Sequence, residues 1–445
     1  MGHRLRWRTD VESEVQIRIM EALFNALKKA TSVAAWKINF SETISTELFY
    51  VQKKVETNRA TDINDISVTI YIDKDGKRGS ATFTVYPYMK EEEISSLIEE
   101  NIFAASFTFN TFFDLPSPEA FENKKAEGNL TEIPFRELIG KIGAAIMKAN
   151  HFENGSLSAT EIFLTKTNTR IVNSNGVDVS TTSYGCKIET IPNWVKGEEE
   201  VELYKSIEFS SFDADALTKE VEEALLLAKA RSEAIKLPHL DSIPVILENE
   251  EAFRFFGSYA MELSYLTKYS HQNHYEVGDK IQDNRIGDIM DMELRPSVEG
   301  AISSCFVDRD GVVLKPVKIV DGGIAKAMFG PFREGYYLGV KKPTGEVPIL
   351  CVKEGETSIK EIEKKPYIRC VRFSDAQFDK DSGFFGGEVR LGFYFDGEKE
   401  IPVTGFTIQG NLNKAKNEFI ASKERVVLSR YSGPKYVCIP NVNLV

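Results

Sequence analysis

The segment from Ile243 to His274 constrains the fold most, because its hydrophobic period changes within a few residues. An apolar run from Ile243 to Leu247 is typical of a buried strand. After the polar turn Glu248 to Glu251, apolar and aromatic residues recur at helical spacing, which predicts a helix over Glu250 to Leu266. A polar stretch containing His271 and His274 follows. A strand that leads into a helix beside paired imidazoles is a place where a hydrolytic metal site could be built.

The chain before this segment alternates helices and strands. A capping box of Thr9 and Glu12 opens a predicted helix that ends at Ala30. Asp73 to Gly76 is a turn signal between two alternating strands. The pattern predicts strands over 34–40, 47–56, 66–72, 79–86, 157–165, 169–173, 178–190 and 201–209, and further helices over 90–105, 135–150 and 213–235.

The chain of 445 residues is too long for one ordinary core. We predict an α+β N-terminal half, with an antiparallel sheet and helices, formed by a domain over 1–106 and a middle segment over 107–236. Pro238 stops the helix before the next part. Short strands and Gly-rich turns then predict a β-rich, sandwich- or barrel-like C-terminal domain over 237–445.

Composition excludes several classes of protein. Hydrophobic residues make up 42% and charged residues 27%, as in globular proteins, and no window approaches the roughly 18 apolar residues of a membrane span. The net charge of −12 argues against direct nucleic-acid binding. Five dispersed cysteines without a C-x-x-C pair indicate reduced, mostly buried thiols, and the N-terminus lacks an apolar signal core. We therefore expect a cytoplasmic location.

Candidate site residues are few. His271 and His274 are three apart, so on a helix they would share one face and could bind a metal with Glu276 or Asp279 as helper. The polar composition favours a solvated loop instead. Asp308 and Asp310 fit a turn better than an acid/base pair. The run from Ser382 to Gly387 lacks the lysine of a phosphate loop, so it predicts a mobile loop or a close strand crossing.

Several ordered segments resemble the TldD/PmbA family, whose members are described as modulators of DNA gyrase or peptide-maturation proteins. These segments are Thr169 to Gly176, Val307 to Val312, Val320 to Ile324, Gly387 to Gly392, Phe395 to Gly397 and Ile401 to Asn411. The resemblance implies that a TldD-like subunit carries a His-Glu-x-x-x-His zinc motif on the helix of its C-terminal domain, and that a PmbA-like (TldE-like) subunit lacks it. The corresponding helix here, Glu250 to Leu266, contains no histidine.

The resemblance therefore implies a zinc-motif-lacking, non-catalytic partner in a metallopeptidase system that matures or degrades peptides. It implies a homodimer, or a heterodimer with a zinc-bearing TldD-like subunit, that holds peptide by strand addition. No catalytic residue, metal ligand or cofactor is assigned to this chain. Two alternatives stay open: a divergent metallopeptidase with zinc at His271 and His274, and a regulator that binds DNA gyrase.

Overall fold

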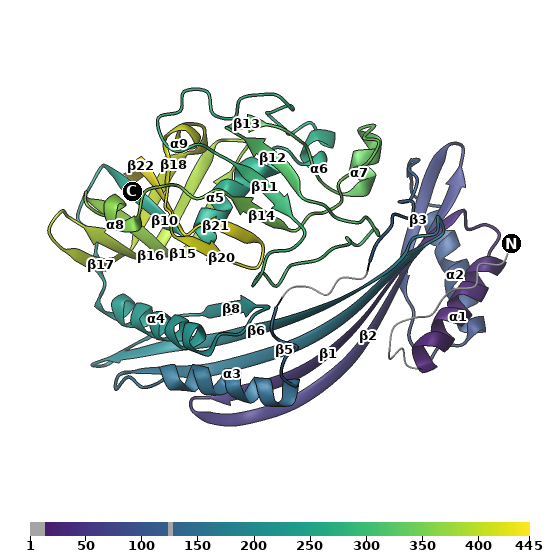
Figure 1. Ribbon diagram of the computed structural model, residues 1–445, viewed down its shortest axis with the longest axis horizontal. Coiled ribbons are helices and arrows are strands. Elements are labelled where there is room, and N and C mark those ends of the chain that lie inside the picture. The colour runs from purple at the N-terminus through teal and green to yellow at the C-terminus, as the bar shows by residue number, and fades with distance from the viewer. Residues whose placement is uncertain (1–13, 123–127) are drawn as a thin grey trace.

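The computed structural model describes residues 14–122 and 128–445, and its fold is α+β as predicted. A long curved sheet forms the N-terminal half, and the C-terminal half lies over the concave side of this sheet (Figure 1). In the described part of the chain, the strands of the long sheet are β1 (Ala35–Val51), β2 (Lys54–Lys74), β3 (Lys77–Thr84), β4 (Phe109–Thr111), β5 (Gly155–Asn173), β6 (Asp178–Lys196), β7 (Glu199–Glu202) and β8 (Lys205–Phe209). Their order is β4-β3-β2-β1-β5-β6-β7, with β8 also on β6.

The strands of the long sheet are longer than predicted. The predicted strand 34–40 and the first part of 47–56 are one strand, β1, whereas residues 54–56 lie beyond a turn and begin β2. The predicted strands 157–165 and 169–173 are one strand, β5. Polar residues such as Thr43 and Thr167 interrupt the apolar alternation, but they still pair across β1 and β5. The predicted strand 201–209 is instead divided into β7 and β8. Backbone pairing continues through polar residues because it does not depend on which side chains are buried.

Helices cover the long sheet at both ends (Figure 1). They are α1 (Glu14–Lys29) and α2 (Glu91–Ala105) at one end, and α3 (Phe135–Ala149) and α4 (Ala214–Glu233) at the other. Ile38 and Val68 pack under the first pair, whereas Ile162 and Leu164 pack under the second. Each pair therefore has its own apolar core. The predicted capping box of Thr9 and Glu12 lies outside the described residues.

The turn that joins β2 to β3 is the one predicted from Asp73 to Gly76. Asp75 and Gly76 both have positive φ, 52° and 72°. Positive φ at both central residues is the geometry of a two-residue hairpin turn, and Asp-Gly is a favoured sequence for it. This prediction is confirmed.

The C-terminal half contains two further sheets. The barrel-like sheet consists of β9 (Ile235–Lys236), β10 (Ser242–Glu248), β15 (Tyr367–Asp379), β16 (Phe384–Phe395), β17 (Glu400–Thr404), β18 (Phe406–Asn411), β19 (Ile420–Ala421) and β22 (Tyr436–Leu444). Its pairings run β15-β10-β22-β18-β16, and β15 also pairs with β16, which closes the ring. Closure leaves fewer free strand edges.

The third sheet is called the charged sheet here, after one of its faces. Its strands are β11 (Met292–Arg295), β12 (Val317–Asp321), β13 (Ile324–Ala325), β14 (Ile349–Val352), β20 (Arg425–Val427) and β21 (Tyr431–Pro434), in the order β13-β12-β11-β14-β21-β20.

The helices of this half are α5 (Glu250–Met261), α6 (Tyr265–Tyr269), α7 (Phe332–Tyr337), α8 (Ile359–Ile362) and α9 (Leu412–Glu418). Among the described residues, none of the helices combines the length and apolar character that crossing a membrane requires.

The predicted boundaries near residues 106 and 236 stay predictions. Strands from before and after residue 106 belong to the same long sheet, since β4 pairs with β3 and β5 pairs with β1. The chain then enters the barrel-like sheet through β9, which pairs with β17.

Candidate functional site

Helix α5 occupies the centre of the C-terminal core. It follows β10, whose residues Val245 to Leu247 are fully buried, as the sequence predicted. Phe255 and Phe256 have no exposed surface and contact Phe419 with ring centroids 5.7 and 5.4 Å apart. Tyr259 donates a hydrogen bond to the Leu412 carbonyl at 2.8 Å. Aromatic packing therefore dominates this helix.

The helix is shorter than predicted. It ends at Met261, and a second short helix, α6, begins after Ser264. Ser264 has an extended backbone (φ −76°, ψ 140°), and its side chain accepts a hydrogen bond from the Leu266 N–H at 3.2 Å. A serine in this conformation caps a new helix, so a continuous helix to Leu266 is interrupted there.

His271 and His274 do not lie on a helix, and they do not form a pair. His271 is exposed with φ 57° at the end of a turn. His274 instead contacts Glu262: its Nδ1 lies 2.8 Å from Oε1, and its backbone N–H donates to Oε2 at 2.8 Å. Glu262 is buried, so its carboxylate holds the loop that carries His274.

The proposed helper carboxylates are also engaged elsewhere. Glu276 forms an ion pair with Lys268, and Asp279 accepts a hydrogen bond from the Glu276 N–H at 2.7 Å. In residues 14–122 and 128–445, no three His, Cys, Asp or Glu side chains gather in a way that could hold a metal ion. A catalytic zinc needs three protein ligands and an open position, so the residues present do not fit that ion.

The first turn of α5 carries two carboxylates, Glu250 and Glu251, and no histidine. Burial raises the pKa of Glu250 and of Glu251, and nearby Arg254 opposes both shifts. Arg254 lies 3.5 Å from Glu251 and donates to the Ala376 carbonyl at 2.9 Å. Burial also lowers the pKa of Arg372. These groups tie α5 to β15. The sequence predicts Glu250 and Glu251 only as part of a polar turn and of the first turn of the helix, with no role in a site.

Asp308 is a turn residue, as predicted. Its carboxylate accepts hydrogen bonds from the N–H groups of Asp310 (2.9 Å), Val312 (3.0 Å) and Glu346 (3.1 Å). Burial, and then the charge of Asp310, raises the pKa of Asp308 to about 6. Asp310 forms an ion pair with Lys37 of β1, so this turn also joins the C-terminal half to the long sheet.

The glycine run is the predicted close strand crossing. A Cβ at Gly387 would lie 1.9 Å from the Asp375 carbonyl oxygen, and one at Gly386 would lie 2.1 Å from that of Ile408. Both glycines belong to β16, which pairs with β15 and β18 at these positions. Because only glycine permits this approach, the run closes the barrel-like sheet.

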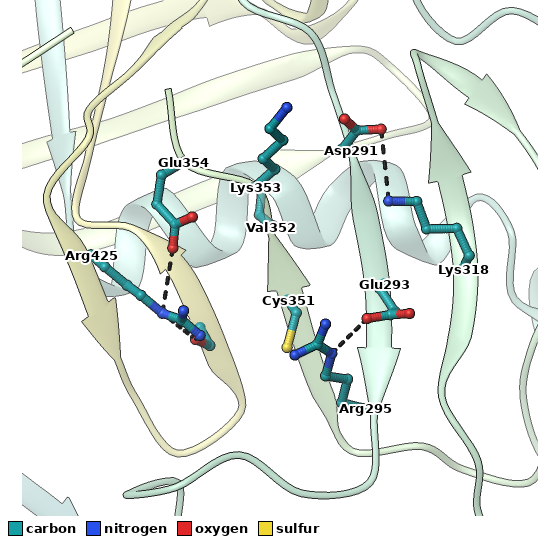
Figure 2. Close-up of a pocket in the computed structure, with 10 residues that line it drawn as sticks. Asp291, Glu293, Arg295, Lys318, Cys351, Val352, Lys353, Glu354 and Arg425 are labelled. Carbon is teal, nitrogen blue, oxygen red and sulfur yellow. Dashed lines mark hydrogen bonds and ion pairs between the residues drawn. The ribbon is translucent and has the colours of Figure 1, made fainter. Parts of the chain in front are cut away.

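The charged sheet presents a hollow that sequence reasoning missed (Figure 2). The inward face of the sheet buries Met292, Leu294 and Leu350. On the outward face, register places Lys318 beside Glu293, Glu293 beside Cys351, and Cys351 beside Ser432. These residues line a hollow of about 260 Å³, together with Asp291, Arg295, Val352, Lys353, Glu354 and Arg425. The alternation Met-Glu-Leu-Arg in β11 was the available signal.

Ion pairs arrange the charges of this hollow. Arg425 lies 3.4 Å from Glu354 and donates to Ser432 at 2.9 Å, and Lys318 lies 3.8 Å from Asp291 (Figure 2). The hollow contains four cationic and three anionic side chains, so it suits a ligand with both charges better than a simple anion.

The cysteines are free, as expected for reduced thiols. Cys186, Cys370 and Cys438 are buried, and burial raises the pKa of each thiol. Burial also raises the pKa of Cys351, although Arg295 and Arg425 oppose the shift. None of these thiols is therefore an activated nucleophile.

Residues 241–444 match the profile of the PmbA/TldA metallopeptidase C-terminal domain. This segment contains α5, the charged sheet and nearly all of the barrel-like sheet. No curated protein matches the sequence significantly.

Solved structures share the whole fold. TldE from Thermococcus kodakarensis is 16% identical, with a TM-score of 0.78 over 95% of this chain and 100% of that chain. A candidate modulator of a DNA gyrase from Thermotoga maritima is 17% identical, with a TM-score of 0.75 over 96% and 99%. One from Bacteroides thetaiotaomicron is 15% identical, with a TM-score of 0.77 over 97% and 99%. Residues 241–444 therefore match the C-terminal domain of the PmbA/TldA metallopeptidase family, and the whole chain shares the fold of these solved structures.

Proposed function

We propose that this chain is a non-catalytic subunit of a cytoplasmic metallopeptidase system that matures or degrades peptides. One observation carries the proposal: residues 241–444 match a metallopeptidase domain, yet α5 has phenylalanines and carboxylates and no histidine. A zinc-bearing subunit of the same family would supply the catalytic metal, and this chain would hold peptide. It would work as a homodimer or as a heterodimer with that subunit, without a cofactor of its own.

The charged sheet supports a peptide-holding role. β20 is an end strand of this sheet, and it borders the hollow through Arg425. The Leu428 N–H donates to the Tyr431 carbonyl, and the Lys435 N–H donates to the Glu424 carbonyl, so Glu424 and Leu428 point their backbone groups toward β21. Successive residues of an antiparallel strand point these groups to opposite sides, so the N–H and C=O groups of Arg425 and Val427 face outward. An extended peptide could add to this edge and place side chains over the hollow.

Peptide binding tests this edge directly. Val427→Pro removes the outward N–H, whereas the control Val427→Ala keeps it. With a short fluorescein-labelled peptide of alternating valine and lysine, we expect Val427→Pro to weaken binding about tenfold, because one hydrogen bond and the strand geometry are lost. Val427→Ala should bind as the unsubstituted chain does. Equal binding by both variants would contradict peptide addition at β20.

Metal content tests the non-catalytic role. After equilibration with zinc and removal of loose ions, we expect elemental analysis to find no retained zinc. Near one zinc per chain that is lost in a His271→Ala/His274→Ala variant would instead favour the divergent metallopeptidase. The geometry of these histidines gives that alternative no support.

A second candidate function comes from two similar structures described as candidate modulators of DNA gyrase. A pull-down of purified gyrase by the purified chain tests it. Retention of gyrase without binding of the labelled peptide would favour this role over peptide handling.

A further inference from the structure

One end of the hollow in the charged sheet is built around Arg425. Its guanidinium donates to the Ser432 hydroxyl at 2.9 Å and lies 3.4 Å from the Glu354 carboxylate. These contacts use Nε and Nη2, so Nη1 donates no hydrogen bond to a described residue. Because the Arg425 side chain is half exposed, this nitrogen is available to an acceptor that enters the hollow.

The other end of the hollow is built around Glu293. Its Oε2 lies 2.5 Å from Arg295 Nε, whereas its Oε1 accepts no hydrogen bond from a described residue. Register places Glu293 beside Cys351, and Cys351 beside Ser432. Figure 2 accordingly shows the Cys351 side chain between the guanidinium groups of Arg425 and Arg295. Each end therefore offers one cation and one anion, and Cys351 separates the two ends.

A ligand with a single charge fits this arrangement poorly. A lone carboxylate that approaches Arg425 also meets Glu354, and a lone ammonium group that approaches Glu293 also meets Arg295. A ligand with one group of each sign can place both groups beside opposite charges at once. The hollow therefore favours a dipolar ligand.

The spacing of the strands sets the length of this ligand. Ser432 on β21 and Glu293 on β11 have only β14 between them, so their backbones are about 10 Å apart. An extended chain spans at most roughly 3.3–3.6 Å per residue, so two or three residues connect the two ends. The volume of about 260 Å³ also suits a small ligand, since sites for drug-sized molecules begin near roughly 300 Å³.

We propose that the hollow binds peptides of two or three residues with free termini. The α-carboxylate lies at Arg425 and the terminal ammonium group at Glu293, while Cys351 and Val352 lie beneath the peptide backbone. Breakdown of longer peptides releases molecules of this class. The identification of the ligand as a product rests on the proposed function, whereas the binding itself depends only on the hollow.

Trialanine is a suitable probe, because only its termini are charged. A ligand-observed NMR titration of the full chain compares trialanine with N-acetyl-trialanine, trialanine amide and free alanine. We expect each of the three comparison ligands to bind about tenfold more weakly, because each loses a charged contact at one end of the hollow.

Two variants test which side chain binds which terminus. Arg425→Gln should weaken the binding of trialanine about tenfold but should not weaken that of trialanine amide, which has no carboxylate to lose. Glu293→Gln should weaken the binding of trialanine but not that of N-acetyl-trialanine. Each substitution is then coupled to one terminus only, which a general loss of structure would not produce.

Arg390 and Glu388 provide matched controls. They form an ion pair at 3.2 Å on β16, outside the hollow, and are two residues apart like Glu293 and Arg295. The Arg390 side chain is 55% exposed, close to the 50% of Arg425. Arg390→Gln and Glu388→Gln should therefore bind trialanine as the unsubstituted chain does.

Absence of trialanine binding to the unsubstituted chain would overturn the proposal. So would equal binding of trialanine and its blocked forms, or alanine that binds as tightly as trialanine. An equal effect of Arg425→Gln on trialanine and its amide, or lost binding in the control variants, would also overturn it. The Val427→Pro test concerns the backbone edge of β20 and a longer peptide, so either proposal can fail while the other holds.

Discussion

The carboxylate of Glu262 accepts two hydrogen bonds from His274, one from the ring Nδ1 and one from the backbone N–H, both at 2.8 Å. Glu262 directly follows α5, so this contact attaches the loop after α6 to the end of the central helix. The ring Nδ1 acts as the donor because a carboxylate oxygen accepts, and the His274 side chain is 53% exposed. These hydrogen bonds position the loop that carries His274, and they are not part of a metal site.

Removing Glu262 should cost more stability than removing His274. Glu262→Ala leaves a buried cavity and breaks both hydrogen bonds, so we expect the free energy of unfolding to fall by about 2–3 kcal/mol. His274→Ala keeps the backbone bond, and water replaces a ring that is half exposed, so about 1 kcal/mol is expected. Urea denaturation measures both. Equal losses would contradict a backbone role for Glu262.

Asp308 should make stability depend on pH. Its folded pKa of about 6 lies above its ordinary 3.8, so the folded state binds the proton more tightly than the unfolded state. The resulting stabilisation is fully present below about pH 4 and is lost as pH rises through 6. It amounts to on the order of 3 kcal/mol.

Asp308→Asn should remove this contribution, because the amide does not titrate. Other carboxylates also make the free energy of unfolding change with pH. The measured quantity is therefore the difference in unfolding free energy between the unsubstituted chain and Asp308→Asn, followed from pH 4 to pH 7. We expect that difference to change with pH in the direction given above. A constant difference would show that Asp308 titrates normally.

Two glycine-to-alanine variants should have opposite effects. In Gly387→Ala the new Cβ would overlap the Asp375 carbonyl, so we expect the unfolding free energy to fall by about 3 kcal/mol or more. In Gly257→Ala the nearest atom is Phe253 Cε2 at 3.8 Å. Position 257 is inside α5, so alanine should stabilise the chain by about 0.5–1 kcal/mol. Thermal unfolding followed by circular dichroism distinguishes the two signs.

The ion pair of Lys37 and Asp310 should couple the long sheet to the C-terminal half. Their side chains are only 12% and 22% exposed. A double-mutant cycle with alanine should give a coupling energy on the order of 1 kcal/mol. The control pair, Lys148 and Asp215, is 67% and 92% exposed, and its coupling should be near zero. Equal couplings would mean that burial does not strengthen the first pair.

Much of the local structure could be predicted from sequence, because its signals are local. The Asp-Gly turn, the buried strand β10 and the helices α2 and α3 follow from hydrophobic period and turn chemistry over a few residues. The turn role of Asp308 was predictable for the same reason. The fold class followed from the order of such segments.

The continuous strands β1 and β5 were not predictable, because their central residues are polar and only pairing with distant strands keeps them extended. The interruption of α5 at Ser264 depends on a serine cap that competes with a plausible helical pattern. The hollow around Cys351 gathers residues from five strands, and no local pattern brings Glu293, Arg425 and Ser432 together.

The sequence by itself determined that α5 carries no histidine, and therefore that this helix cannot supply a zinc motif, because ligand identity is a property of residue type alone. Only the tertiary structure decided what His274 and Asp310 contact. Those contacts depend on where distant segments meet, and the meeting points are set by strand pairing and by packing around α5. Residue type limits the available chemistry, whereas the fold decides which groups come close enough to use it.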